Sequence, residues 1–108
     1  MASDYQICIT TCPTGDLAEK IARALVEEKL AACVNILPTM QSIYRWRGQI
    51  ESADERLLLI KTRVKDYPAV EQRIRALHSY ELPEVIAVPI VDGLPAYLSW
   101  LGNSDATP

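Results

Sequence analysis

The sequence predicts an α+β domain in which helices are separated by strand segments. Three observations support this class: period-two alternation near the start, apolar residues at helical spacing in two later stretches, and β-branched runs between them. Proline and glycine mark most of the boundaries. The 108 residues are enough for one hydrophobic core without disulfides but too few for two. We therefore expect a single domain over residues 1–108.

The first strand and helix are predicted within residues 5–30. In the segment YQICITTC, Cys8, Thr10 and Cys12 fall on one face, which is strand periodicity, and Pro13 ends the strand. Either Thr14 or Asp16 would cap the next helix. The buried stripe of that helix is expected to contain Leu17, Ile21, Ala24 and Leu25.

The middle of the chain predicts a hairpin over residues 40–63. Residues 32–50 are typical of one long strand, interrupted at Pro38 and turning near Arg47-Gly48. Residues 52–55 are polar, and ERLLLIKTRV then supplies a strongly apolar second strand.

The last part predicts a helix, a strand and a terminal helix. Asp66 is a suitable cap for the first of these helices, with Pro68 in its first turn and its end around His78. EVIAVPIV is the strand, and Pro89 favours an edge position. LPAYLSWL has apolar residues at helical spacing, and residues 102–108 are expected to be frayed.

The resulting order is the ferredoxin-like βαββαβ sandwich, with an extended hairpin and a C-terminal helix. Both inner helices would cover one face of the sheet. The other face should then alternate with polar residues if it met water, but residues 57–60 and 85–91 are apolar on both faces. Because the chain has no second domain to cover that face, we expect a closed homo-oligomer.

Composition excludes several classes of function. A formal net charge of −3 with scattered arginines disfavours nucleic acid and anionic membrane surfaces as partners. No apolar run approaches the roughly 20 residues of a membrane span. The start of the chain lacks a signal-type segment, and three cysteines without a CxxC pair favour buried, reduced thiols, so we expect a cytoplasmic protein. With one histidine and no GxSxG turn, the sequence predicts no enzyme of the serine-hydrolase kind.

The stretch SIYRWRGQIE places Tyr44 and Trp46 on one strand face. An aromatic pair on such a sheet is how some proteins stack the bases of single-stranded RNA, but the charge of this chain argues against it. Packing at a subunit interface, where aromatic residues and arginine are enriched, is the simpler interpretation.

The only histidine lies in LHSYELPEV, at the end of the second predicted helix. There His78 would interact favourably with the helix dipole, or it would ligate a metal ion together with Glu84 across the Leu82-Pro83 turn. Two ligands are too few for a metal site. A third would come from the end of the first strand, which we expect to be exposed at Thr10 to Cys12, if the last strand pairs with the first.

Five stretches in order and in matching spacing resemble the CutA family of divalent-cation tolerance proteins over roughly residues 5–101. The resemblance implies a ferredoxin-like subunit in a homotrimer, a cytoplasmic role linked to metal tolerance, and reversible binding of copper or other divalent ions. The stretches are EEKLAACVNILP, SIYRWRGQIE, LLLIKTR, HSYELPEVIAVPI and YLSWL.

The resemblance also implies a set of copper ligands: a cysteine near the end of the first strand, a histidine and a glutamate. His78 and Glu84 match the last two. The cysteine position corresponds to Thr10, with Cys12 two residues further on the same strand face, and the usual proline after the histidine is Ser79. The expected metal ligands are therefore His78, Glu84 and Cys12, and Cys12 would serve only if the loop bends inward.

Two functions follow as hypotheses. The first is a trimeric, non-enzymatic protein that binds Cu(II) or another divalent cation weakly and has no other cofactor. The second is a module that resembles the PII-type trimers and binds a small anion or nucleotide between subunits. Its cleft would be lined by Tyr44, Trp46, Lys61 and Arg63.

Overall fold

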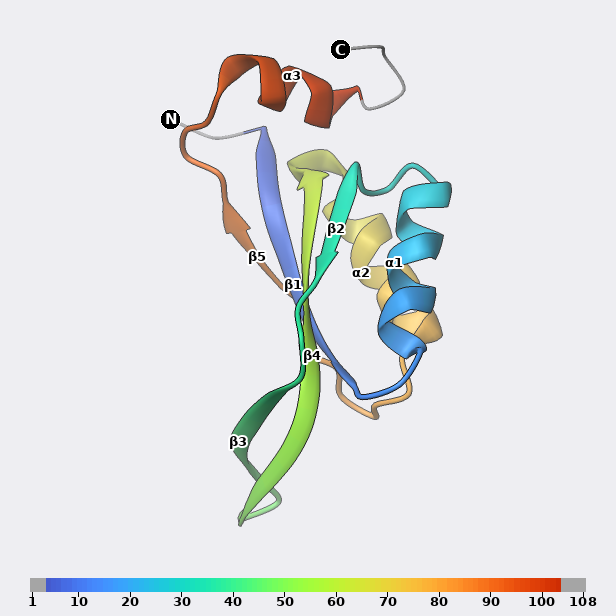
Figure 1. The fold of residues 1–108 in the computed structure, drawn as a ribbon, viewed down its shortest axis with the longest axis vertical. Helices are drawn as coiled ribbons and strands as arrows, with labels where there is room; N and C mark the ends of the chain where they lie inside the picture. Colours follow the sequence, from blue (N-terminus) through green and yellow to red (C-terminus); the bar gives the residue numbers. More distant parts are fainter. Residues whose placement is uncertain (1–3, 104–108) are drawn as a thin grey trace.

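The computed structural model, which describes residues 4–103, has a mixed sheet-and-helix architecture (Figure 1). Its elements follow the predicted βαββαβ order, with an additional strand in the hairpin and a terminal helix. They are β1 (Tyr5–Pro13), α1 (Leu17–Glu27), β2 (Cys33–Ile36), β3 (Met40–Trp46), β4 (Gln49–Arg63), the 3-10 turn η1 (Val64–Asp66), α2 (Tyr67–Leu77), β5 (Ile86–Pro89) and α3 (Pro95–Gly102).

The five-stranded sheet has the order β2-β4-β1-β5, and β3 pairs with the outer part of β4. All of these pairings are antiparallel. Cys8 lies opposite Ile60 on one side and Ala87 on the other, so β1 is central and the expected pairing of the last strand with the first is confirmed. Pro89 belongs to β5, which is an edge strand as predicted, because proline cannot donate to a further neighbour.

The hairpin over residues 40–63 is confirmed, with one difference. The predicted long strand is split around Pro38 into β2 and β3. The polar stretch at residues 52–55, however, does not interrupt the second strand, because β3 pairs along it and satisfies its backbone groups. The result is a 15-residue β4 that carries the hairpin well beyond the helices (Figure 1).

The hydrophobic core lies between the sheet and α1 and α2, which cover the same face (Figure 1). Even-numbered positions of β1, and of the part of β4 that pairs with it from Leu58 onward, point into it, in agreement with the predicted alternation. Its buried members are Cys8, Cys12, Ala18, Ile21, Ala22, Leu25, Ala31, Leu58, Ile60, Val70 and Ile74.

The opposite face of the sheet is apolar and is not covered by α1 or α2. Residues directly opposite in the ladder share a face, which places six apolar side chains together there. Ile86 and Val88 on β5 remain 50% and 44% exposed, respectively. We call this surface the open face; it consists of Ile7, Ile9, Leu57, Leu59, Ile86 and Val88.

Both expected helix caps occupy the N-cap position without capping through their side chains. Asp16 forms an ion pair with Lys20 at 3.4 Å, and Asp66 forms one with Arg63 at 2.8 Å. Both backbones are in the αR region, whereas a capping side chain usually goes with an extended backbone. At the other end of the chain, α3 includes Gly102, and the fraying expected for the remaining tail falls mostly on residues 104–108, which lie outside the described residues.

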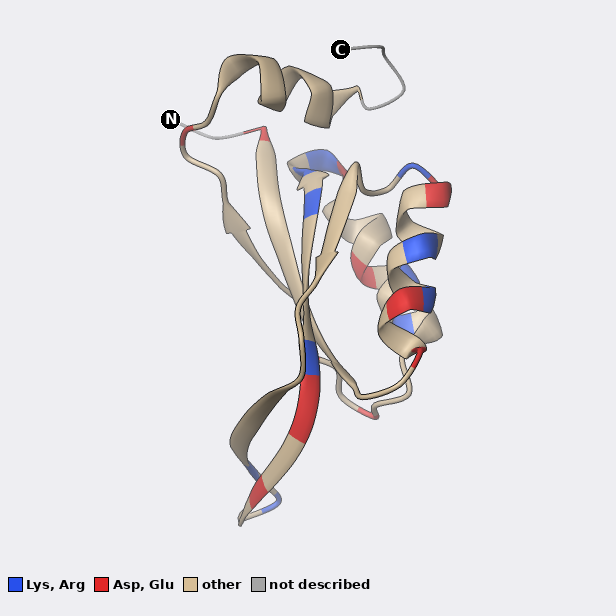
Figure 2. Cartoon of the chain, in the orientation of Figure 1, with Lys and Arg blue, Asp and Glu red and all other residues tan. Residues whose placement is uncertain are grey.

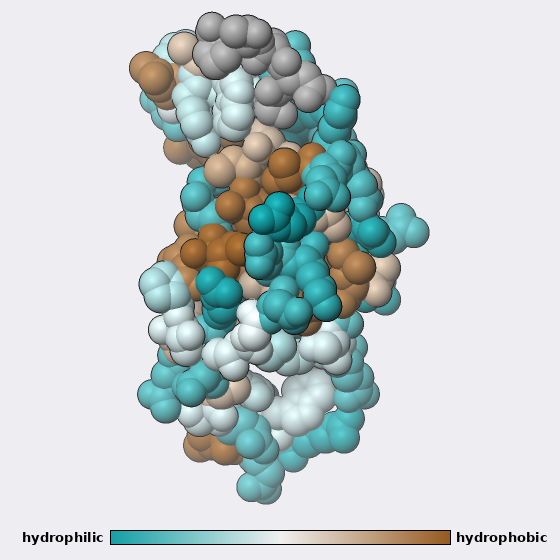
Figure 3. All heavy atoms as spheres, turned by 45° about the vertical axis from the view of Figure 1, so that its right-hand side comes forward, coloured by the Kyte–Doolittle hydropathy of each residue, from teal (hydrophilic) through white to brown (hydrophobic). Residues whose placement is uncertain are grey.

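Charges of both signs are interspersed on α1 and α2, whereas β1 and β5 carry none (Figure 2). On the side shown in Figure 3, hydrophobic residues gather in the middle of the molecule and the hairpin end is mainly hydrophilic or intermediate. None of the helices within residues 4–103 has the length and apolar composition needed to cross a lipid bilayer.

Candidate metal centre

His78 lies at the end of α2, as the sequence predicted. The helix ends at Leu77, and His78 takes an extended backbone while its N–H still donates to the carbonyl of Ile74 at 2.8 Å. This position turns the side chain toward the end of β1, so the imidazole is half-buried between the two elements.

Both ring nitrogens of His78 are engaged. The backbone N–H of Tyr80 donates to Nδ1 at 3.1 Å, and Nε2 lies 2.7 Å from the carbonyl oxygen of Thr11. A carbonyl oxygen only accepts hydrogen bonds, so Nε2 carries the proton and the ring is the neutral Nε2–H tautomer. The imidazole is therefore a satisfied structural group, and binding a metal ion would require it to give up one of these bonds.

Cys12 is the sequence-predicted residue that lies closest to His78. Its Sγ is 3.8 Å from Nε2. Two ligands of one tetrahedral zinc ion, with bonds of about 2.3 Å to sulfur and 2.0–2.1 Å to nitrogen, would be roughly 3.5 Å apart. Cys12 Sγ and His78 Nε2 are thus about as far apart as two ligands of one zinc ion. No inward bend of the loop is needed, because β1 continues to Pro13 and itself places Cys12 beside His78.

The expectation that Thr10 to Cys12 forms an exposed strand end is wrong. Thr10 and Cys12 are completely buried and Thr11 is 8% exposed. Cys12 belongs to the core cluster together with residues of α1, and the His78 ring contacts the Thr11 carbonyl. Burial, and next the charge of Glu55, raise the pKa of the Cys12 thiol to about 11, although Arg56 partly opposes the shift. At neutral pH Cys12 is therefore a thiol, and a metal ion would have to displace its proton.

Glu84 lies apart from this pair. It is exposed, just before β5. Among residues 4–103, no group of three or more His, Cys, Asp or Glu side chains is arranged to hold a metal ion. One chain therefore supplies two close donors, Cys12 and His78, and not a complete set of ligands.

Two further residues surround His78 that sequence reasoning did not identify. The Tyr80 ring packs against the imidazole with centroids 4.6 Å apart, and its hydroxyl donates to Glu55 Oε2 at 2.7 Å. Glu55 is only 6% exposed. Burial, and then the hydrogen bond to Glu55, raise the pKa of the Tyr80 phenol well above its ordinary value. The one available signal was Glu55 itself, an acidic residue beside an apolar strand.

The turn after α2 is also tied to the tip of the hairpin. Arg47 contacts both carboxylate oxygens of Glu81, the closer at 2.9 Å. Its guanidinium also lies 5.3 Å from the centroid of the Trp46 ring. The Glu81 side chain is 73% exposed, so this ion pair lies on the surface.

The side chains expected to line an anion cleft do not meet within one chain. Tyr44 and Trp46 belong to β3 at the hairpin end, whereas Lys61 and Arg63 lie at the opposite end of β4. At about 3.3 Å per residue, the twelve residues from Gln49 to Lys61 span roughly 40 Å. A cleft between subunits stays a prediction.

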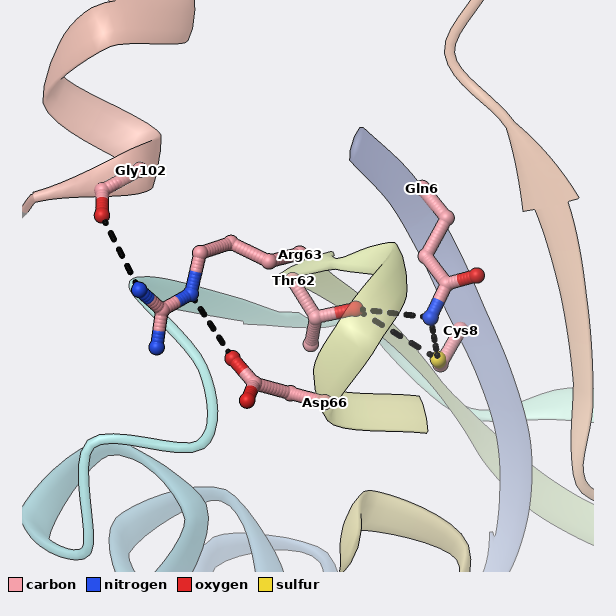
Figure 4. A network of polar contacts seen from close by, with 6 residues as sticks. All are labelled: Gln6, Cys8, Thr62, Arg63, Asp66 and Gly102. Atoms are coloured by element: carbon pink, nitrogen blue, oxygen red, sulfur yellow. Dashed lines mark hydrogen bonds and ion pairs between the residues drawn. The ribbon is translucent and has the colours of Figure 1, made fainter. Parts of the chain in front are cut away.

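The remaining polar interior lies near the other end of β1 (Figure 4). Gln6 Nε2 donates to Thr62 Oγ1 at 3.2 Å, and the buried Cys8 thiol contacts both side chains. Cys8 and Cys12 are buried as predicted, but Cys33 is partly exposed because β2 is an edge strand. Near this network, Arg63 bonds Asp66 and the Gly102 carbonyl, which ties α3 to β4 (Figure 4).

Comparisons with known proteins agree with this fold. Among curated proteins, the chain is 48% identical over 96 residues to "Divalent-cation tolerance protein CutA" of Thermus thermophilus, covering 89% of this chain and 93% of that protein. It is 48% identical over 91 residues to "Protein CutA" of Homo sapiens, covering 84% of this chain and 51% of that longer protein.

Solved structures give the same result. The Cut A1 structure from Thermus thermophilus has a TM-score of 0.89 and 47% identity, with 91% of this chain and 95% of that one covered. CutA1 from Oryza sativa has a TM-score of 0.89 and 42% identity, with 94% of each chain covered. The family model described as "CutA1 divalent ion tolerance protein" matches residues 6–104, so the chain belongs to the CutA1 family of divalent ion tolerance proteins.

Proposed function

We propose that this chain is a non-enzymatic protein that assembles as a homotrimer and binds a divalent cation, such as Cu(II), weakly and reversibly at His78. The proposed metal binding rests on the separation of 3.8 Å between Cys12 Sγ and His78 Nε2. Imidazole and sulfur ligands suit copper and zinc, and the names of several relatives refer to tolerance of divalent cations.

Weak binding follows from the state of the two donors. His78 would give up its hydrogen bond to Thr11, and Cys12 would release a proton from a thiol with a raised pKa. Both changes reduce the net affinity for the ion. Glu84 is exposed on the chain that carries His78, so it would complete the site only after a local movement or from a neighbouring subunit.

Self-association is supported by the open face, and the number of three subunits rests on the resemblance to the CutA family. A sheet face with six apolar side chains, among them the half-exposed Ile86 and Val88, is stabilised when a second copy removes it from water. Light scattering after size-exclusion chromatography should give a mass three times that of the chain. A monomer at micromolar concentration would contradict the assembly.

Calorimetric titration with Cu(II) tests the metal site directly. The wild type should bind measurably, His78→Ala should lose most of the heat, and Cys12→Ser should bind less tightly. Cys33→Ser is the matched control, since Cys33 lies on β2 away from His78 and its loss should change nothing. Indistinguishable isotherms for the wild type and His78→Ala would refute binding at this site.

The cytoplasmic location remains a prediction. One relative is named as chloroplastic in Arabidopsis thaliana, and one structure as periplasmic in Archaeoglobus fulgidus. The interspersed charges on α1 and α2 support the proposal that nucleic acid is not a partner (Figure 2).

A further inference from the structure

The backbone N–H of Tyr80 decides which nitrogen of His78 holds the proton. It points at Nδ1 from 3.1 Å, and this leaves Nε2 as the protonated nitrogen beside Thr11. For Nε2 to offer a lone pair, the proton would have to sit on Nδ1, where it would face the Tyr80 N–H. Two donors directed at each other repel, so His78 can offer Nε2 only when Tyr80 moves.

Tyr80 is held in place by its side chain as well as by its backbone. Its hydroxyl bonds the Glu55 carboxylate at 2.7 Å, and its ring lies against the imidazole. Glu55 projects from β4, in register with the end of β1, and is 6% exposed. A buried, charge-assisted hydrogen bond to a sheet residue is a firm anchor for a turn that is otherwise irregular.

We propose that Tyr80 and Glu55 are positioning residues for His78. Their hydrogen bond acts as a latch that holds the turn after α2 against the imidazole and keeps the ring in the Nε2–H tautomer. Releasing the latch removes the donor that faces Nδ1, so that only the bond to the Thr11 carbonyl still favours a proton on Nε2. The effect of the latch on metal affinity rests on the proposed function of His78, but its effect on the tautomer does not.

The other contact of the turn provides a matched control. Arg47 and Glu81 also link the turn to the hairpin, but their side chains are 70% and 73% exposed. Exposed ion pairs are screened by water and contribute little to the stability of the segments that they join. Glu81→Gln therefore removes the ion pair with Arg47, which is of similar length and lies on the residue next to Tyr80, and leaves the Tyr80–Glu55 hydrogen bond in place.

Nuclear magnetic resonance of the imidazole nitrogens tests the tautomer, and His78 is the only histidine of the chain, so a single ring is observed. At a pH where the ring is neutral, the wild type and Glu81→Gln should show one Nε2–H form. Tyr80→Phe and Glu55→Leu should show a mixture of both tautomers. Glu55→Gln keeps an acceptor for the Tyr80 hydroxyl and should retain the wild-type pattern.

Zn(II) titration of the same proteins tests the consequence for the ligand. Tyr80→Phe should bind Zn(II) about three- to tenfold more tightly than the wild type. This factor corresponds to the free energy of the one hydrogen bond that the substitution removes. Glu81→Gln should bind like the wild type. Circular dichroism confirms that each variant is folded, and Glu55→Leu replaces Tyr80→Phe if the latter is not.

The outcomes separate the two ideas. If His78→Ala binds Zn(II) and Cu(II) like the wild type, the proposed metal site is refuted. The resonance measurement of the tautomer in Tyr80→Phe and Glu55→Leu then still tests the latch. If His78→Ala loses binding but Tyr80→Phe keeps a single Nε2–H form and wild-type affinity, the latch is refuted and the metal site stands.

Discussion

At the scale of single residues, Thr10 is the position where this chain departs from the expected ligand pattern, and its hydroxyl has no hydrogen-bond partner among residues 4–103. The residue is completely buried and Oγ1 is unsatisfied. Thr10→Val keeps the shape and removes the desolvated hydroxyl, so we expect it to raise the free energy of unfolding by roughly 1–2 kcal/mol. Urea denaturation measures this.

Thr62→Val is the matched control for that change. Thr62 is also buried, at 2% exposed, but its hydroxyl accepts from Gln6 at 3.2 Å. Its loss should lower the free energy of unfolding by about 1 kcal/mol, because Gln6 would be left without this partner. Equal effects of the two substitutions would contradict the assignment of Thr10 as an orphaned group.

Tyr67 makes the free energy of unfolding depend on pH in the alkaline range. The hydrogen bond from its hydroxyl to Glu71, at 2.8 Å, and then its burial raise the pKa of Tyr67 to about 12. An unfolded tyrosine titrates near 10. The folded form therefore holds the proton more strongly, and this contribution is complete below pH 10 and is lost as the pH rises toward 12.

Comparing the wild type with Tyr67→Phe tests that window. The wild type should be the more stable below pH 10, and its advantage in urea midpoint should shrink steadily between pH 10 and pH 12. An advantage that stays constant across this range would mean that the phenol does not contribute in this way.

At the scale of elements, the β3–β4 hairpin depends on a two-residue turn. Arg47 and Gly48 have φ values of 50° and 79°, which is the left-handed geometry of a type I′ turn. A Cβ added at Gly48 would meet nothing within 4 Å, so the cost of Gly48→Ala comes from the backbone alone and should be about 1–2 kcal/mol.

Gly48→Asn separates backbone strain from other effects of substitution, because asparagine tolerates this conformation better than alanine. It should cost clearly less than Gly48→Ala in the same urea experiment. If both variants unfold at the wild-type midpoint, the turn is not under this constraint.

The elements also show how far sequence reasoning reaches. The hairpin and the end of α2 at His78 were predictable because alternation, proline and glycine are local signals. The continuity of β4 through residues 52–55 was not, since pairing with β3 overrides the polar composition. The Tyr80–Glu55 contact joins residues 25 apart through the packing of a turn on the sheet, and no local pattern encodes it.

At the scale of the whole molecule, shape and surface both favour assembly. The chain measures 46 × 29 × 24 Å, and its length comes from a hairpin that extends beyond the helices (Figure 1). Such a projection buries little within its own chain, as the 72% exposure of Ile50 shows. Together with the open face, it leaves apolar surface that folding of one copy does not remove from water.

Two valines of nearly equal exposure test which surface the proposed assembly uses. Val88 lies on the open face and is 44% exposed, whereas Val26 lies on α1, on the other side of the sheet, and is 42% exposed. A charge buried at an apolar interface without a partner is strongly unfavourable. Val88→Glu should therefore shift the protein to monomers in light scattering, and Val26→Glu should leave the oligomer intact. If Val26→Glu dissociates the oligomer and Val88→Glu does not, the interface lies on the helical side and not on the open face, because the two substitutions introduce the same charge at nearly equal exposure.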